Sequence, residues 1–287
     1  MMSMTKRGKP ASSAADEVTV CKLLAQGAQD KLEVRLYTPP PTQTADNGLI
    51  VFFPAGGFAT IDLTAADGFV RALAAATMCQ VLASSYTVAG VRPFPAAVED
   101  AYAVLAWAVR NRAKLGWDGK RLLTAGIEAG GNLAAVAAMI ARDRGGPQLA
   151  GQLLIMPMLD PGLTSCSMRN LVNRVGAMFA ASECAAGYRA YLPHAVDRTH
   201  PYASPLRSSR MKGLPPTLIL SADDDPLRDE AEQYGAKLIA AGIKTLVRRL
   251  PPIPLEQPGA RCSCLRKEDA LQEIATFIGG LEATQEA

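Results

Sequence analysis

Long apolar runs are missing from this chain of 287 residues. No stretch approaches the roughly 18 uninterrupted apolar residues that a membrane-spanning helix needs, and the first residues lack the apolar segment of a signal peptide. With 49% hydrophobic and 20% charged residues, the composition is that of a globular protein with a large core. We therefore expect a cytoplasmic protein in which residues 1–16 form a flexible tail and residues 17–287 form a single domain.

Charge of one sign is not concentrated anywhere in the sequence. The 30 basic and 27 acidic residues give a net charge of +3 and form no long block of one sign. This excludes the electrostatic footprint of a protein that binds nucleic acid or an anionic membrane surface. A small molecule is the expected partner, a protein partner is possible, and the oligomeric state is left open.

Patterns of metal ligands are also scarce. The chain has six cysteines and two histidines. Cys262 and Cys264 form a close pair, but there is no second pair and no histidine near them, whereas a structural zinc site uses four nitrogen or sulfur ligands. We therefore expect reduced thiols, no metal and no cofactor.

Short apolar runs alternate with helix-like segments along most of the chain. Residues 17–22 and 32–37 favour an antiparallel edge pair. The wholly apolar run Leu49–Phe53 indicates a strand buried on both faces of a parallel sheet. Further strands are expected at residues 80–84, 121–125, 152–156, 217–221 and 243–249, with helices beginning near residues 64, 95, 129, 226 and 266. This alternation predicts an α/β fold with a doubly wound, mostly parallel sheet of about eight strands.

The alternation lapses between about residues 160 and 213. A helical segment around residues 168–191 and a proline-rich return lie there. Because a structureless loop of that length is uncommon inside a compact domain, we expect an inserted helical cap over the carboxyl edge of the sheet. Phe58, Met178 and Phe179 are expected to line a pocket between this cap and the sheet.

The run Gly126-Ile127-Glu128-Ala129-Gly130 follows an apolar β-rich segment and precedes an alanine-rich helical segment. This is the setting of the Gly-x-Ser-x-Gly nucleophile elbow, in which a sharp strand-to-helix turn exposes the serine at the helix N-terminus. Glu128 stands in the serine position. The main question that the sequence raises is therefore whether the chain is an enzyme.

Taken with further motifs, the elbow makes the chain resemble the hormone-sensitive-lipase-like branch of the α/β-hydrolase fold, which includes bacterial esterases and acetyl hydrolases. The resemblance extends over residues 32–278 and also rests on the glycine turn after Phe53, on residues 92–102 and 214–219, and on the run at residues 225–230. It implies an α/β-hydrolase fold, an oxyanion hole, and a Ser-His-Asp triad in the chain order nucleophile, acid, histidine.

The oxyanion hole of this family begins with a His-Gly-Gly-Gly loop. The resemblance places that loop on Pro54-Ala55-Gly56-Gly57, so the histidine and the first glycine are replaced. The backbone N–H groups of Gly56, Gly57 and Ala129 are the expected remainder of the hole.

The triad that the resemblance implies is degenerate. Asp225 matches the acid, Glu128 replaces the serine, and Leu255 stands where the histidine is expected. His194 and His200 fall in the presumed cap, and we interpret them as ordinary polar surface residues because a catalytic histidine must reach the nucleophile.

These replacements favour a non-catalytic pseudoesterase. Losing either the serine or the histidine costs such an enzyme several orders of magnitude in rate. A helix N-terminus stabilises an anion, so we expect the Glu128 carboxylate to fold back into the oxyanion hole and plug it. The fold would then bind a small apolar ligand or a protein partner.

The alternative is a weak or atypical hydrolase of carboxylic esters that uses Glu128, Asp225 or both. If Glu128 were a nucleophile, its intermediate would need a base to activate water, and Leu255 supplies none. The two carboxylates could instead form an acid–base couple, because their repulsion in a partly dry pocket would favour protonation of one of them.

Several of these charged residues also have structural interpretations. Asp225 could cap the helix that follows it, and Glu99 and Asp100 are expected at the solvated start of another helix. Three arginines, Arg228, Arg248 and Arg249, could counter the pocket carboxylates or form ordinary surface ion pairs.

Overall fold

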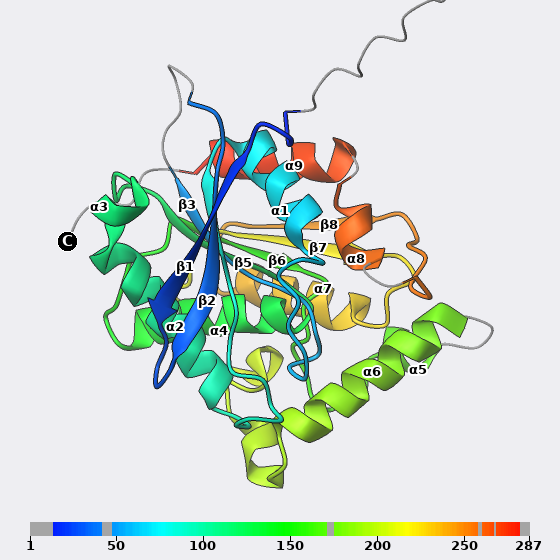
Figure 1. The fold of residues 1–287 in the computed structure, drawn as a ribbon. Coiled ribbons are helices and arrows are strands. Elements are labelled where there is room, and N and C mark those ends of the chain that lie inside the picture. Colours follow the sequence, from blue (N-terminus) through cyan, green and yellow to red (C-terminus); the bar gives the residue numbers. More distant parts are fainter. Residues whose placement is uncertain (1–13, 42–47, 171–174, 258–259, 267, 282–287) are drawn as a thin grey trace, which may run out of the picture.

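A computed structural model of the chain describes residues 14–41, 48–170, 175–257, 260–266 and 268–281. Within these residues, eight strands form one sheet in the order β1-β2-β4-β3-β5-β6-β7-β8 (Figure 1). The strands are β1 (Thr19–Gln26), β2 (Lys31–Thr38), β3 (Leu49–Phe53), β4 (Gln80–Ser84), β5 (Leu122–Ile127), β6 (Gly151–Ile155), β7 (Thr217–Ala222) and β8 (Thr245–Leu250). The first hairpin pairs antiparallel with itself and with β4, and the other strand pairs are parallel.

Helices cover both faces of this sheet. They are α1 (Asp67–Thr77), α2 (Ala96–Arg110), α3 (Arg112–Leu115), α4 (Ala129–Asp143), α5 (Cys166–Arg169), α6 (Val175–Tyr191), α7 (Arg228–Ala240), α8 (Ala260–Cys264) and α9 (Glu268–Gly279), with short 3-10 turns η1 (Ala195–Thr199) and η2 (Pro205–Arg207). Helices α2, α4 and α7 pack on one face, and α1, α8 and α9 pack on the other (Figure 1). This arrangement confirms the predicted doubly wound fold.

The central strands show why the sequence folds in this way. Every residue of β3 is buried. Val51 and Phe53 contribute to the core beneath α2 and α4, while Ile50 and Phe52 contribute to the core beneath α1 and α9. Because successive side chains of a strand point to opposite faces, a strand covered on both sides needs apolar residues throughout. Each buried phenylalanine stabilises the fold by about 1.5–3 kcal/mol.

The segment between β6 and β7, where the cap is expected, contains α5, α6, η1 and η2. Figure 1 shows α5 and α6 extending away from the sheet at the lower right. Four residues of the segment, 171–174, and residues 1–13 of the expected tail at residues 1–16 lie outside the described part of the chain.

Asp100 corrects one expectation from the sequence. Instead of lying in solvent, it is 1% exposed and accepts hydrogen bonds from the backbone N–H groups of Ala28 and Thr87, both at 2.9 Å, and from the Thr87 hydroxyl at 2.6 Å. The carboxylate ties the loop after β1 to the start of α2. Sequence periodicity could not reveal these contacts, because the donors lie far away in the chain.

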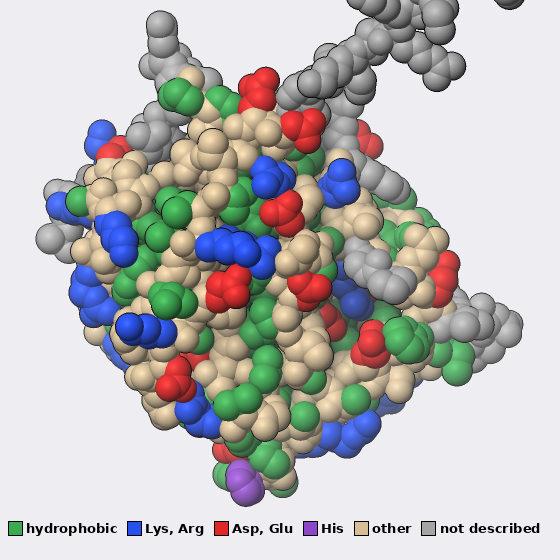
Figure 2. Space-filling view, viewed as in Figure 1, with side chains coloured by type: hydrophobic (Ala, Val, Ile, Leu, Met, Phe, Trp, Pro, Cys, Tyr) green, Lys and Arg blue, Asp and Glu red, His purple; other side chains and the backbone are tan. Residues whose placement is uncertain are grey.

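Charged side chains of both signs are interspersed over the face of the molecule drawn in Figure 2. Among the described residues, no helix combines the length and the hydrophobicity that crossing a membrane requires. The cytoplasmic location expected from the sequence stays a prediction.

Two glycines let the N-terminus of α4 approach the sheet closely. A Cβ atom on Gly130 would lie 2.0 Å from the Phe53 carbonyl oxygen, and one on Gly126 would lie 2.0 Å from the Gly130 carbonyl oxygen. No side chain fits at either position without moving the backbone. The turn between β5 and α4 is therefore held against the end of β3, next to the loop that follows β3.

We expect Gly130→Ala to lower the free energy of unfolding by about 3 kcal/mol, because the added methyl group overlaps the Phe53 carbonyl. Denaturant titration of both proteins measures this change. Gly90→Ala is the control, since a Cβ at Gly90 meets no atom within 4 Å. If the two variants unfolded at the same denaturant concentration, the close approach of Gly130 to the Phe53 carbonyl would be contradicted.

Candidate active site

Glu128 stands at a sharp turn between β5 and α4. Its backbone has φ 58° and ψ −115°, a conformation that a residue with a side chain adopts only when the surroundings enforce it. The Glu128 N–H donates to the Ile155 carbonyl at 3.0 Å, and the Met158 N–H donates to the Glu128 carbonyl at 3.0 Å. The turn thus has the strained backbone of a nucleophile elbow.

The loop after β3 lies directly beside this elbow. The Gly56 N–H donates to Oε2 of Glu128 at 3.1 Å, so the carboxylate reaches back to the expected oxyanion loop. Among the described residues, neither Gly57 nor Ala129 donates its N–H to this carboxylate. Of the three expected N–H donors, that of Gly56 therefore contacts the carboxylate.

Helix α6 crosses over the same loop. A Cβ on Gly187 would lie 2.2 Å from the Gly57 carbonyl oxygen, so the two backbones touch. Phe58, which follows Gly57, stacks on Tyr191 of α6 with ring centroids 3.9 Å apart. The loop and the helix therefore form one packed unit above the elbow.

The Arg261 guanidinium lies between Glu128 and Asp225. Its Nε is 2.8 Å from Oδ2 of Asp225, its Nη2 is 3.2 Å from Oδ1, and its Nη1 is 3.9 Å from Oε1 of Glu128. The Arg261 side chain is 11% exposed and those of Glu128 and Asp225 are 9% and 0% exposed. A cation thus links the two positions that a triad histidine would connect.

Burial by itself would lower the pKa of Arg261, but the charges of Asp225 and Glu128 outweigh it and hold the pKa above its ordinary value. The guanidinium therefore stays charged at any physiological pH. Asp225 also accepts a hydrogen bond from the Leu227 N–H at 2.8 Å, so it shapes the turn before α7 as well as pairing with Arg261.

Arg261 was missed by the reasoning from sequence, which considered Arg228, Arg248 and Arg249. Those three pair elsewhere, with Asp229 at 2.9 Å, Glu273 at 3.1 Å and Glu232 at 2.8 Å. A usable signal was present, since Arg261 is the only basic residue between Leu250 and Leu265, and two buried carboxylates need a cation.

A cavity of about 420 Å³ opens above Glu128 and Arg261. Its other lining residues come from the oxyanion loop, from residues 60–66, from α6, and from residues 255–262. Leu255, at the expected histidine position, lines this cavity. The lining thus combines the Leu255 side chain with the Arg261 guanidinium and the Glu128 carboxylate.

The three residues expected to line the pocket lie in different surroundings. Phe179 lines the cavity and is 57% exposed. Met178 is 55% exposed and is not among the lining residues. Phe58 is fully buried, because its ring packs between the oxyanion loop and α6. His200 packs against the rings of Phe94 and Tyr202 and does not line this cavity.

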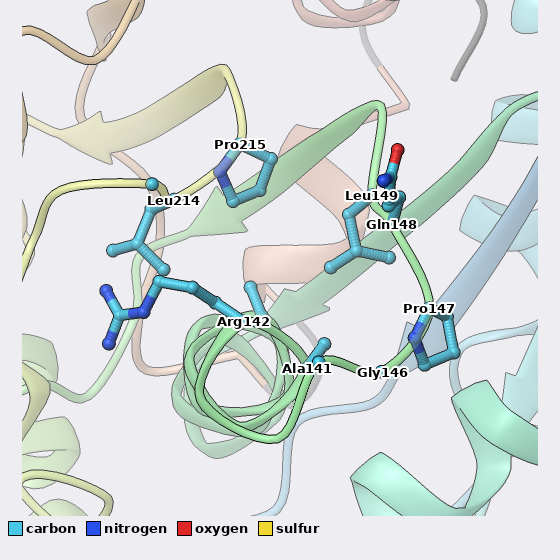
Figure 3. A pocket seen from close by; sticks show the side chains of 11 residues that line it. Ala141, Arg142, Gly146, Pro147, Gln148, Leu149, Leu214 and Pro215 are labelled. Carbon is cyan, nitrogen blue, oxygen red and sulfur yellow. The ribbon is translucent and has the colours of Figure 1, made fainter. Parts of the chain in front are cut away.

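A larger cavity, of about 510 Å³, lies at the far end of α4 (Figure 3). Its walls include Pro147, Leu149 and Leu214, and Arg142 is its charged lining residue. The Arg142 guanidinium donates to the Arg210 carbonyl at 2.7 Å and pairs with Asp143. This cavity contains no carboxylate, thiol or hydroxyl side chain in its lining, so the cavity above Glu128 is the better candidate for chemistry.

Cys262 lines the cavity above Glu128. Burial, reinforced by the negative charge of Glu128, raises the pKa of its thiol to about 11. Because only the thiolate reacts with alkylating agents, we expect iodoacetamide to modify Cys262 slowly near about pH 8 and faster toward about pH 10. Peptide mass spectrometry measures the rate, with exposed Cys21 as the internal control. Equal labelling of the two thiols near about pH 8 would contradict this environment.

We expect Arg261→Met to lower the free energy of unfolding by about 3–5 kcal/mol, because it leaves two buried carboxylates without a counter-charge. Thermal or denaturant unfolding measures the loss. Arg248→Met is the matched control, since Arg248 and its partner Glu273 are 47% and 43% exposed and their ion pair is screened by water. An Arg261→Met protein as stable as the control would show that the guanidinium does not hold the site together.

Comparison with known proteins places this geometry in a family. Residues 50–254 match the family described as alpha/beta hydrolase fold. Esterase LipI of Mycobacterium tuberculosis is 34% identical over 241 residues, which cover 83% of this chain and 74% of that protein. The arylesterase of Saccharolobus solfataricus is 32% identical over 221 residues, covering 77% and 71%.

Two solved structures of esterases are also similar to this chain. A thermostable esterase from Pseudomonas putida superposes with a TM-score of 0.82 at 28% identity, over 93% of this chain and 83% of that one. The esterase of Pyrobaculum calidifontis superposes with a TM-score of 0.79 at 31% identity, over 92% and 85%.

These matches correct the main functional expectation drawn from the sequence. A non-catalytic pseudoesterase is contradicted, since the relatives at 32–34% identity are named as esterases. The alternative expectation, an atypical hydrolase of carboxylic esters, is better supported. This chain, with its eight-stranded sheet, its elbow at Glu128 and its extensive similarity to these proteins, belongs to the esterase family of the α/β-hydrolase fold.

Proposed function

We propose that the chain hydrolyses small carboxylic esters by an atypical route in which the Glu128 carboxylate is the base. The observation that carries this proposal is the position of Oε1 of Glu128. This oxygen makes no hydrogen bond to any described residue, belongs to a side chain that is 9% exposed, and lies in the lining of the cavity. It is free to accept a hydrogen bond from a bound water molecule.

The reaction then needs one base and no covalent intermediate. Oε1 of Glu128 takes a proton from water as the water oxygen attacks the ester carbonyl carbon. The resulting oxyanion accepts hydrogen bonds from the N–H groups of Gly57 and Ala129. As the bond to the alcohol oxygen breaks, protonated Glu128 returns the proton to that oxygen. The acid and the alcohol leave, and the carboxylate is restored.

Direct attack by Glu128 on the ester is less consistent with the site. It would form an acid anhydride, and water would then need a second base to cleave it. Leu255 has no titratable group, and the Asp225 carboxylate is fully buried and bound to Arg261. A water molecule activated by Glu128 avoids that second step.

Arg261 and Asp225 have positioning roles in this scheme. Asp225 fixes the guanidinium through two short contacts, and the guanidinium attracts Oε1 of Glu128 at 3.9 Å. In this scheme Glu128 and Asp225 do not form the acid–base couple considered from the sequence. Both carboxylates pair with Arg261 instead.

We expect slow but measurable hydrolysis of p-nitrophenyl acetate. General base catalysis typically accelerates a reaction about 100-fold or more, so Glu128→Gln should lower kcat/KM by at least that factor. Glu99→Gln, which changes a partly exposed residue that pairs with Arg144 outside the cavity, is the matched control. Turnover that survives Glu128→Gln unchanged would exclude Glu128 as the base.

Restoring the family's triad tests the positions assigned to its members. We expect Glu128→Ser with Leu255→His to gain little esterase activity, because Arg261 already binds the Asp225 carboxylate that the histidine needs. Adding Arg261→Ala should release Asp225 and raise kcat further, by about 100-fold or more if the triad forms. Burst kinetics with p-nitrophenyl acetate report the acyl-enzyme. A triple variant no faster than the double variant would show that Arg261 does not block the histidine position.

A further inference from the structure

The cavity above Glu128 has an excess of negative charge. Besides Glu128, three carboxylate residues line it, namely Asp62, Glu183 and Glu256. Its lining contains one cationic side chain, that of Arg261. Because Arg261 is bound by Asp225 beneath the cavity, its charge is already balanced before the lining carboxylates are counted.

The titration of neighbouring groups agrees with this charge distribution. Burial raises the pKa of Glu183, and repulsion by Glu128 raises it further, while Arg261 acts in the opposite direction and does not prevail. The pKa of Cys184 is raised by burial and by the same carboxylate, again against Arg261. In both groups burial is the largest cause, and the negative charge of Glu128 adds to it.

The lining also offers contacts for an alkylated cation. The Phe179 ring, 57% exposed, lies in the lining together with the small side chains of Ala65, Ala66 and Ala180. An aromatic face attracts an ammonium group, and methyl groups on the nitrogen pack against alanine. Within the part of the chain that is described, no cluster of histidine, cysteine, aspartate or glutamate suits a metal ion, so an organic cation fits this lining better than a metal.

The inner end of the cavity has room for a further polar contact. Oε1 of the nine-tenths buried Glu128 side chain faces Arg261 at 3.9 Å, which is too long for a hydrogen bond. In the proposed reaction a water molecule binds there. Glu183 and Glu256 then attract the rest of the substrate, while Oδ1 of Asp62 accepts hydrogen bonds from the N–H groups of Thr64 at 2.8 Å and Ala65 at 3.0 Å.

We propose that the preferred substrates are esters of an alcohol that carries a positively charged ammonium group. This inference rests on the proposed esterase function. The ester carbonyl lies beside Glu128 and the N–H groups of Gly57 and Ala129, and the ammonium group lies among Glu183, Glu256 and the Phe179 ring. Anionic esters are disfavoured, because the carboxylates repel them and Arg261 has no uncompensated charge.

The test compares two esters of nearly equal shape. Acetylcholine has a trimethylammonium group, and 3,3-dimethylbutyl acetate has a carbon atom in place of the nitrogen. We expect kcat/KM for acetylcholine to exceed that for the neutral ester by about tenfold at low ionic strength. The preference should shrink as salt screens the carboxylates. Equal or faster hydrolysis of the neutral ester would overturn the proposal.

Variants identify the carboxylates responsible. Glu183→Gln combined with Glu256→Gln should reduce the preference for acetylcholine at least threefold, because two of the lining charges are removed. Glu273→Gln is the control, since Glu273 pairs with Arg248 outside the cavity, and it should keep the preference. If the double variant keeps the same preference as Glu273→Gln, the lining carboxylates do not select the substrate.

A binding measurement separates this proposal from the proposed function. If neither ester is hydrolysed, the esterase proposal fails. The preference for a positive charge is then measured by titrating the intact protein with choline and with its neutral isostere, 3,3-dimethylbutan-1-ol. Chemical-shift changes at Phe179 and Glu183 report binding in the cavity. Tighter binding of choline supports the inference, and equal or weaker binding of choline overturns it.

Discussion

The ion pairs of Arg261 with Asp225 and Glu128 are the interaction on which the site depends. They join α8, the turn before α7 and the elbow, three segments that are far apart in the chain. Two carboxylates this deeply buried would be strongly destabilising without a counter-charge. Arg261 supplies that charge from a position between the two carboxylates. The strained elbow, the oxyanion loop and the contact between that loop and α6 therefore surround two carboxylates and one guanidinium.

Much of the fold could be predicted from the sequence, because local patterns specify it. Apolar runs such as Leu49–Phe53 are buried on both faces, and the alternating stretches near the N-terminus do pair antiparallel. The elbow was also readable, since Gly126 and Gly130 are required by close backbone approach and their spacing around Glu128 is visible in the sequence. These features depend on residues that are neighbours in the chain.

The arrangement of charges could not be predicted in the same way. Asp100 is buried because Ala28 and Thr87 donate to it, and Arg261 reaches Asp225 from a helix, α8, that no periodicity indicated. Both contacts are tertiary. The replacement of serine and histidine that the resemblance implies, taken alone, favours a molecule without activity. That inference considered which groups were lost and did not include the cation that the fold places between the two remaining carboxylates.

The central claim is that Glu128 activates water and never bonds to the substrate. A single turnover of p-nitrophenyl acetate in water labelled with oxygen-18, with excess enzyme, tests it most directly. If Glu128 is the base, the label appears in the released acetate, the peptide that contains Glu128 stays unlabelled in the mass spectrum, and p-nitrophenol and acetate are released at the same rate. Oxygen-18 in the Glu128 carboxylate, or release of p-nitrophenol ahead of acetate, would mean that this side chain had formed an anhydride that water then cleaved, which would contradict the account.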